Sequence, residues 1–375
     1  MKIVEIRSAV AVIPLRMPVA WSNVAVTERE YILVWVIADD GQTGFGYGLG
    51  SRFAKGAAFL HQAVQDLLAP VLLGQDPFMS TALWQAMYAR TLLLGRRGGV
   101  LKAISAVDIA LWDLKAKAVG QPLYKLLGGH RAAVPVYASG GYYGPDKGLP
   151  ELAAEIERYR ARGFADVKIK VGGATLAVDE ARIALARDIV GEGRVALDAN
   201  NAWANLAAAL PAVRRFEKFE PWWLEEPFPP DAIGAFVDLA PRCAIPLATG
   251  ELEATRWPFR DLIERRGVHI VQADATVCGG VTEWLRIAHL AAGFDLPMAP
   301  HWAPDLHAHL VAAVENGLTV EYFTPDEDIV NFPTLLASHL DISDGLIHLS
   351  QAPGHGIDLD AAAVARYTVL DSRAA

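Results

Sequence analysis

The sequence predicts an α/β protein in which a (β/α)₈-type barrel follows an α+β region of about 125 residues. Three observations favour this fold. Eight short β-rich runs alternate with helical patterns from about residue 130 onward, which is typical of a parallel sheet. Eight such units in roughly 200 residues fit a closed barrel better than the alternative, a doubly wound open sheet. Nearly every run ends in an ionisable residue, at the end of the strands where barrel enzymes carry their active sites.

The N-terminal region begins with strands. Met1–Val12 and Tyr31–Ala38 are rich in β-branched and other apolar residues, as strands are. The turn-forming residues 39–42, Asp-Asp-Gly-Gln, follow the second run, so we expect a hairpin over Tyr31–Gly46.

The hairpin leads into an alternating glycine run, Gly44, Gly46, Gly48 and Gly50. This spacing does not match the dinucleotide-binding fingerprint, and we predict a flexible loop here. Helical patterns then cover Ala57–Leu72, Ser80–Leu93 and Leu101–Val119. Gly120 and Pro122 mark the end of the last helix.

The predicted barrel strands are five to seven residues long and lie at 134–139, 167–171, 195–199, 222–226, 245–251, 269–274, 296–301 and 319–323. The helical patterns between them include Glu151–Arg162, Leu176–Val190, Leu206–Phe216, Trp257–Arg266 and Val281–Ala292. We therefore divide the chain into an α+β region at 1–125, a barrel at 126–340 and a β-and-loop segment at 341–375. The last segment is expected to pack back on the N-terminal region.

Composition excludes several classes of protein. The 375 residues carry 34 Lys and Arg against 43 Asp and Glu, a net charge of −9, which argues against a nucleic-acid partner. Two cysteines rule out a disulfide scaffold. No run approaches the roughly 18 apolar residues of a membrane span. Glu5 and Arg7 interrupt the start where a signal peptide needs an apolar core, so we expect a soluble cytoplasmic protein.

A series of ionisable residues ends the predicted strands at intervals of 20 to 28 residues, about one βα unit. Its members are Lys168 with Lys170, then Asp198, Glu225, Glu251, Asp274, His301 and Glu321. In a barrel these side chains converge at one mouth. The alternative is that each charge merely begins a solvated loop. That explanation suits a single residue but not seven consecutive strands with suitable chemistry.

Three adjacent strands end in carboxylates, Asp198, Glu225 and Glu251. An all-oxygen ligand set without a thiol suits Mg²⁺. Without a cation the three carboxylates would raise one another's pKa. Glu226 lies next to Glu225 and points to the opposite side of the strand. Spacing alone does not decide between them, and we choose Glu225 because its side matches the neighbouring ligands.

Lys168 and Lys170 share one face of their strand, because they are two residues apart. Two neighbouring ammonium groups should lower each other's pKa, which would make one lysine a usable base near neutral pH. The alternative, an exposed edge strand, fits poorly with the apolar neighbours.

Asp274 and His301 end the sixth and seventh predicted strands. A carboxylate on one ring nitrogen would fix the tautomer and raise the basicity of the other nitrogen. His307 and His309 follow on a predicted helix. Together with His301 they suggest a zinc cluster, but their spacing matches no familiar zinc site, and we predict structural roles for both.

These motifs together resemble the enolase superfamily, mandelate racemase subgroup, over nearly the whole chain. Residues 103–129 are similar to the N-terminal-domain signature, VKIKV carries the Lys-x-Lys motif, and LDAN, LEEP and TGE resemble the three metal-ligand motifs. Residues 297–313 are especially similar to dehydratases acting on galactarate and talarate.

The resemblance implies an α+β capping domain formed by both termini, a modified barrel, Mg²⁺, and abstraction of the proton α to a carboxylate. It implies that Lys170 is the base on one face of the substrate and that His301 is the acid or base on the other. Lys168 would stabilise developing negative charge. Glu321, if protonated, would donate a hydrogen bond to a substrate carboxylate. Asp274 would complete a dyad with His301.

Two enzymatic functions share this set of residues. The first is dehydration of an acid sugar, aldonate or aldarate, to a 2-keto-3-deoxy acid. The second is racemisation or epimerisation of a 2-hydroxy acid. A non-catalytic relative of the same fold is a third and weaker alternative, because it would not need the intact ring of residues.

Specificity is expected to lie in the capping loops. We predict substrate contacts for Trp21, Asn23, Tyr47 and Arg52, and a contact to a distal carboxylate or a hydroxyl for Arg52 or Lys55. The alternative for Arg52 and Lys55 is a solvated loop charge. The expected partner is a small carboxylate, with no nucleic acid and no membrane. The resemblance also favours a homo-oligomer.

Overall fold

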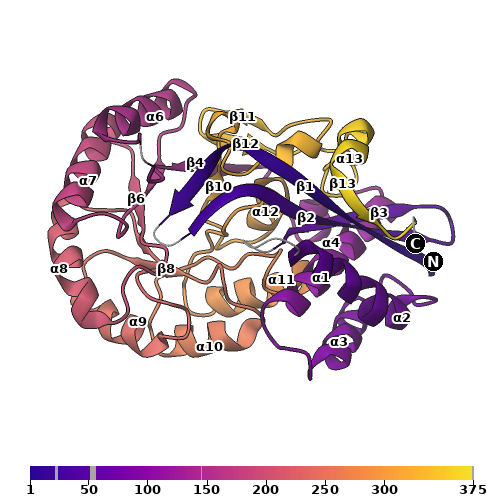
Figure 1. Ribbon diagram of the computed structural model, residues 1–375. Coiled ribbons are helices and arrows are strands. Elements are labelled where there is room, and N and C mark those ends of the chain that lie inside the picture. Colours follow the sequence, from indigo (N-terminus) through magenta and orange to yellow (C-terminus); the bar gives the residue numbers. More distant parts are fainter. Residues whose placement is uncertain (22–23, 51–55, 145, 374–375) are drawn as a thin grey trace.

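A computed structural model describes residues 1–21, 24–50, 56–144 and 146–373. The expected α/β architecture is confirmed: a helix-covered barrel stands beside a smaller α+β domain, and both chain ends lie in the smaller domain (Figure 1). Among the described residues, no helix combines the length and apolar character needed to cross a membrane.

The capping domain contains a four-stranded antiparallel sheet in the order β13-β1-β2-β3. The strands are β1 (Ile3–Trp21), β2 (Val24–Ala38), β3 (Thr43–Leu49) and β13 (Thr368–Asp371). β2 and β3 form the predicted hairpin, with Val36 opposite Gly44. The first and last strands of the chain are neighbours here, so both termini build this domain.

The glycine run is not a flexible loop, and that prediction was wrong. Gly44, Gly46 and Gly48 lie within β3, which packs against helix α4 (Gly99–Ala118). A Cβ atom on Gly46 would lie 2.0 Å from the Ala106 carbonyl oxygen, and one on Gly44 equally close to the carbonyl oxygen of Ala110. The alternating glycines therefore belong to a strand, and the absence of side chains on one of its faces lets the backbone of α4 approach closely.

The helices of the capping domain follow the predicted ranges closely. They are α1 (Gly56–Ala63), a π-helical turn η1 (Val64–Leu68), α2 (Ala69–Leu72), α3 (Ser80–Thr91), α4 and α5 (Leu123–Leu126). Apolar residues of α1, η1, α2, α3 and α4 form a separate core with β1 and β2, whereas Leu123 and Tyr124 of α5 belong to the core of the barrel.

The barrel strands are β4 (Ala133–Gly140), β5 (Val167–Lys170), β6 (Val195–Asp198), β7 (Leu224–Glu225), β8 (Leu247–Thr249), β9 (Ile270–Val271) and β10 (Val320–Tyr322). All neighbours pair in parallel, and β10 returns to pair with β4. The predicted strand at 296–301 is reduced to bridges from Met298 to Val271 and Gly317. The barrel nevertheless closes in the predicted order.

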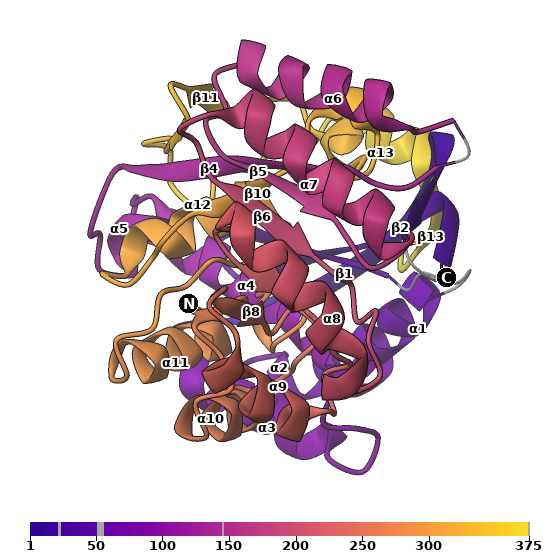
Figure 2. The ribbon, with the colours of Figure 1, turned by 90° about the vertical axis from the view of Figure 1, so that its left-hand side faces the viewer.

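The barrel helices cover the outside of the strands (Figure 2). They are α6 (Leu149–Ala161), α7 (Leu176–Val190), α8 (Leu206–Phe216), α9 (Ile233–Leu239), α10 (Arg256–Glu264), α11 (Gly280–Ala292) and α12 (Pro304–Ala313). Short 3₁₀ turns lie at Glu217–Phe219, Ala240–Arg242, Pro325–Glu327 and Phe332–Leu335.

The C-terminal segment is shared between the two domains. β11 (Asp341–Ser343) and β12 (Leu346–His348) form a hairpin that pairs with the start of β4. Only the later part, α13 (Ala361–Tyr367) and β13, joins the capping domain. β4 begins three residues before its pairing with β10, and those residues, 133–135, bind β12.

Hydrogen bonds between α4 and α11 connect the two domains. The Asp108 carboxylate accepts from the Thr282 backbone N–H at 2.8 Å and from the Thr282 hydroxyl at 2.7 Å. Trp84 Nε1 donates to the Gly279 carbonyl at 2.7 Å. These contacts bind α3 and α4 of the capping domain to Gly279, at the end of the loop that follows β9, and to the first turn of α11.

Candidate active site

A cavity of about 140 Å³ lies where the capping domain meets the mouth of the barrel. Lys170, Glu251, Asp274 and His301 line it from the barrel. Lys170 comes from β5, and His301 follows the seventh strand position. In the closed order β4 to β10 these two positions lie on nearly opposite sides. A molecule in the cavity therefore has a lysine on one side and a histidine on the other.

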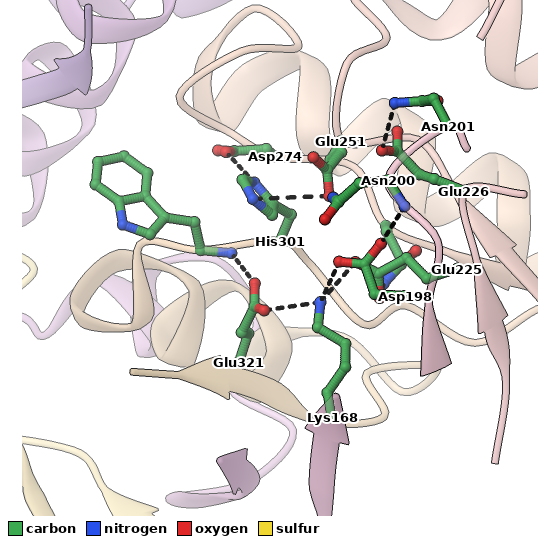
Figure 3. A network of polar contacts seen from close by, with 12 residues as sticks. Lys168, Asp198, Asn200, Asn201, Glu225, Glu226, Glu251, Asp274, His301 and Glu321 are labelled. Atoms are coloured by element: carbon green, nitrogen blue, oxygen red, sulfur yellow. Dashed lines mark hydrogen bonds and ion pairs between the residues drawn. The ribbon is translucent and has the colours of Figure 1, made fainter. Parts of the chain in front are cut away.

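Lys168 lies beneath this cavity, at the centre of a buried ion cluster. Its Nζ is 2.5 Å from Glu225 Oε1, 2.7 Å from Glu321 Oε1 and 3.8 Å from Asp198 Oδ2 (Figure 3). Lys168 is 1% exposed and is not among the residues that line the cavity. The structure thus gives it a role in organising the carboxylates around it.

The expected lowering of the two lysine pKa values is wrong. Burial by itself would lower the pKa of Lys170, but the ion pair with Asp198 raises it above its ordinary value. Burial acts in the same way on Lys168, and Glu225 and Glu321 raise its pKa well above the usual range. Each ammonium group is paired with a carboxylate, Lys168 with Glu225 and Lys170 with Asp198, and the attraction outweighs the mutual repulsion.

The three predicted metal ligands are buried carboxylates at neighbouring positions of the mouth. Asp198 and Glu225 are paired across β6 and β7, and Glu251 follows β8. The described part of the chain holds no group of three metal-binding side chains already arranged around one point. Glu251 Oε2 is buried without a hydrogen-bond partner among the described residues, which leaves an oxygen available to a cation.

Glu225 is held in place from inside the barrel. Lys168 binds its Oε1, while Trp223 Nε1 at 3.0 Å and Gln272 Nε2 at 2.7 Å donate to its Oε2. Burial, and then the charge of Asp198, raises the pKa of Glu225 to about 8. The expected electrostatic cost of crowding is thus found for Glu225. For Asp198 it is not: burial would raise the pKa of Asp198, but Lys170 and Lys168 lower it below its ordinary value.

Glu226 points away from Glu225, as its neighbouring position on the chain predicts. Its Oε2 accepts a hydrogen bond from Asn201 Nδ2 at 3.1 Å. It has a positive φ of 43°, because the strand ends there. Burial, followed by the charge of Glu251, raises the pKa of Glu226 well above its usual range.

His301 lies between two carboxylates. Its Nδ1 is 3.0 Å from Asp274 Oδ2, and its Nε2 is 3.7 Å from Glu251 Oε2 (Figure 3). Burial would lower the pKa of His301, but Glu251 and Asp274 raise it to about 9. The imidazole is therefore protonated near neutral pH and can donate a proton from Nε2.

His307 and His309 have hydrogen-bond partners in the backbone. His307 accepts from the Ala275 N–H at 3.0 Å and contacts the Trp302 carbonyl at 2.6 Å. His309 accepts from the Tyr124 N–H at 3.3 Å. These contacts agree with the structural roles predicted for both residues.

Glu321 is not in the protonated state that its expected role requires. Burial would raise its pKa, but Lys168 and then His301 lower it to about 2. Its Oε2 accepts the Trp302 backbone N–H at 2.8 Å. The carboxylate is therefore an acceptor that orients Lys168 and the chain after His301.

Tyr47 does not line this cavity. Gly44 and Gly46 face α4, and Tyr47 lies one residue further along β3, so its side chain points to the other side of the strand. There it stacks on Phe332 with a centroid distance of 4.2 Å and lines a second cavity of about 180 Å³. Of the other predicted capping-loop contacts, Asn23, Arg52 and Lys55 lie outside the described residues, as does the side chain of Trp21.

Sequence reasoning missed several residues that line the cavity, among them Arg29, Tyr31, Lys102, Tyr142, Asn200 and Trp302. Asn200 stands in the LDAN motif and Trp302 follows His301, so their position next to predicted site residues was a usable signal. Arg29 and Lys102 lie on a strand and a helix of the capping domain, where nothing in the local pattern distinguishes them from surface charges.

Comparisons with known proteins cover both domains. Residues 3–128 match the mandelate racemase / muconate lactonizing enzyme N-terminal domain, and residues 151–363 match the enolase C-terminal domain-like family. An arabinonate dehydratase from Saccharolobus solfataricus is 34% identical over 331 residues, 86% of this chain and 87% of the relative. An L-talarate/galactarate dehydratase from Salmonella typhimurium is 32% identical over 362 residues, 94% of this chain and 88% of the relative.

The fold comparison agrees. A crystal structure of a racemase from Streptomyces coelicolor A3(2) with bound magnesium superposes with a TM-score of 0.91 at 31% identity, covering 98% of this chain and all of that one (100%). Matches to both domain families, together with relatives above 30% identity over most of the chain, show that this protein belongs to the mandelate racemase subgroup of the enolase superfamily.

Proposed function

We propose that this protein is a Mg²⁺-dependent acid-sugar dehydratase that converts an aldonate or aldarate to a 2-keto-3-deoxy acid. The observation that carries the proposal is the placement of Lys170 and His301 on nearly opposite sides of one cavity beside buried carboxylates. The relatives named as arabinonate and L-talarate/galactarate dehydratases support the same reaction class.

Asp198, Glu225 and Glu251 are the residues proposed to hold the magnesium ion. The donors are all oxygen, which suits Mg²⁺. Glu251 Oε2, buried and without a hydrogen bond from any described residue, and the raised pKa of Glu225 fit a cation among them. When bound, the ion would supply positive charge that stabilises the substrate carboxylate as negative charge develops. Asp198, as one of its ligands, would then pair less strongly with Lys170.

In the proposed reaction, Lys170 acts as the neutral amine, which becomes available when the charge of Asp198 is shared with the cation and no longer raises the lysine pKa as strongly. Its Nζ removes the proton at C2, next to the carboxylate. The electron pair of the broken C–H bond passes toward the carboxylate. His301 Nε2 then protonates the hydroxyl at C3, the C–O bond breaks and water leaves. The resulting enol tautomerises to the 2-keto-3-deoxy acid. Asp274 keeps the imidazole oriented throughout, through its contact with Nδ1.

The test is incubation of the protein with Mg²⁺ and a panel of sugar acids in D₂O. Formation of a keto acid supports dehydration. Lys170→Ala and His301→Asn should each lower kcat by about 10²–10⁴-fold, the usual contribution of an acid–base group. Turnover that survives both substitutions would rule out this assignment.

Racemisation or epimerisation of a 2-hydroxy acid is the second candidate. The same two residues, one on each side of C2, would exchange its proton, and the structural similarity to a racemase favours keeping this alternative. Deuterium incorporated at C2 without loss of water would establish it and exclude dehydration.

A further inference from the structure

His307 is a buried imidazole that lies between the two loops carrying Asp274 and His301. It belongs to α12 and is 0% exposed. Its Nε2 accepts the backbone N–H of Ala275, the residue after Asp274, at 3.0 Å. Its Nδ1 lies 2.6 Å from the carbonyl oxygen of Trp302, the residue after His301. One side chain therefore joins the chain just beyond each member of the acid–base pair.

These two contacts determine the protonation of the His307 ring. A nitrogen that accepts a backbone N–H carries no proton, so the single proton of the neutral imidazole lies on Nδ1 and is donated to the Trp302 carbonyl. Burial lowers the pKa of His307 below its ordinary value, in agreement with a neutral ring. Both nitrogens thus bind backbone groups, and His307 is not among the residues that line the active-site cavity.

The chain after His301 needs support because its backbone conformation is unfavourable. Trp302 and Ala303 have φ values of 54° and 45°, in the left-handed region that residues with a Cβ seldom adopt. The Trp302 N–H donates to Glu321 Oε2 at 2.8 Å, and the Trp302 carbonyl accepts from His307. A buried side chain therefore holds each polar backbone group of Trp302, and loss of either contact would let the backbone next to His301 relax.

We infer that His307 is a positioning residue for the Asp274–His301 pair. By holding the residue after each of them, its ring fixes the separation at which Asp274 Oδ2 lies 3.0 Å from His301 Nδ1. A displacement of about 1 Å in a reacting group can lower a rate by about 10²-fold, so this spacing matters for proton transfer. The inference rests on the proposed function, since it assigns His307 to the step in which His301 transfers a proton.

The alternative is that His307 only satisfies two buried backbone groups and contributes to stability. His309 provides the matched control for such a role. It lies two residues further along the same helix, is 3% exposed, and accepts the Tyr124 N–H at 3.3 Å. Tyr124 belongs to α5 and does not line the cavity. Substitution of His309 therefore removes a buried imidazole acceptor without changing a contact next to the acid–base pair.

The kinetic experiment compares His307→Gln and His307→Asn with His309→Gln, in Mg²⁺ and the sugar acid that the unmodified protein converts. Glutamine can place its amide oxygen where Nε2 accepts, and asparagine its amide nitrogen where Nδ1 donates, so each variant keeps one of the two contacts. We expect both His307 variants to lower kcat by about 10- to 100-fold with little change in KM, because substrate still binds but the pair is misplaced. His309→Gln should leave kcat near that of the unmodified protein.

The value of Tm, measured for every variant, separates positioning from stability. An equal loss of kcat in His309→Gln at an equal loss of Tm would overturn the inference. Full activity in either His307 variant would also overturn it, because a spacer must hold both ends. Added to His301→Asn, His307→Gln should cause no further loss of kcat, since groups that act as a unit are not additive.

Crystal structures with Mg²⁺ test the geometry without reference to activity. In the His307 variants the distance from Asp274 Oδ2 to His301 Nδ1 should exceed about 3.5 Å, whereas His309→Gln should keep it near 3.0 Å. An unchanged distance in the His307 variants would overturn the inference even if the unmodified protein is a dehydratase. A longer distance, with no keto acid formed from any sugar acid by the unmodified protein, would leave the inference standing and refute the proposed function. The two failures are therefore distinguishable.

Discussion

At the scale of single residues, the proposed metal ligands are oriented by hydrogen bonds from neighbouring buried side chains. Gln272 is fully buried and donates to Glu225 at 2.7 Å. We expect Gln272→Leu to weaken Mg²⁺ binding by about 10- to 100-fold, because residues that orient ligands contribute to metal affinity on that scale. Calorimetric titration of the metal-free protein measures this without reference to activity.

Asn316→Leu is the control for Gln272→Leu. This substitution also removes a barrel amide, here a partly buried one, but among the described residues its Nδ2 donates to the Ala288 and Leu296 carbonyls and not to a carboxylate. The affinity for Mg²⁺ should then be unchanged. A Gln272→Leu variant with normal affinity would show that Glu225 needs no support from this amide.

Asp274 acts through His301 in the proposed mechanism. Asp274→Asn removes the carboxylate that orients Nδ1, and we expect kcat to fall roughly 10²-fold or more. The double variant with His301→Asn should be no slower than His301→Asn alone, since groups acting as a unit are not additive. Additive losses in the steady-state rates would contradict this dependence.

At the scale of elements, the glycines of β3 allow this strand of the capping domain to pack closely against α4. Gly46→Ala places a Cβ 2.0 Å from the Ala106 carbonyl oxygen, so strand and helix must separate. Overpacking of this kind costs about 1–3 kcal/mol of unfolding free energy. Urea unfolding with unchanged slope measures the loss.

Gly48→Ala provides the matched comparison on the same strand. The nearest atom to a Cβ there is Ile32 Cγ2 at 3.5 Å, an ordinary contact. Its unfolding free energy should stay within about 1 kcal/mol of the unchanged protein. If both alanine variants lose the same stability, backbone propensity and not helix approach explains the glycines.

At the scale of the whole molecule, the capping domain must stay in contact with the barrel, because residues of both domains line the active-site cavity. Asp108→Ala leaves the buried Thr282 N–H without its acceptor, which costs about 1–3 kcal/mol. We expect a lower Tm and faster proteolysis between the domains. Asp108→Asn keeps an amide oxygen as acceptor and should lose less. Equal losses would indicate that the charge, not the hydrogen bond, connects the domains.

Local sequence patterns predicted much of the fold of this protein, because a parallel barrel repeats the same pattern of a short β-rich run followed by a helix. The βα period placed a charged residue at each strand end, and the closed order of strands then required those residues to converge. The seventh strand was predicted from the same period, although its pairing is reduced to Met298. The prediction of a flexible loop at the glycine run was wrong because the glycines pack against a helix more than 50 residues away along the chain, and local sequence does not reveal this contact.

The sequence by itself determined the barrel order and the identity of the residues around its mouth, since both follow from local period and strand alternation. The tertiary structure decided the pKa values of these residues and which side chains lie next to them. Lys168 and Lys170 have raised pKa values because carboxylates from other strands surround them. Arg29 and Lys102 reach the cavity only because the capping domain is folded against the barrel mouth. Charge interactions depend on distance in space, which the order of residues alone does not specify.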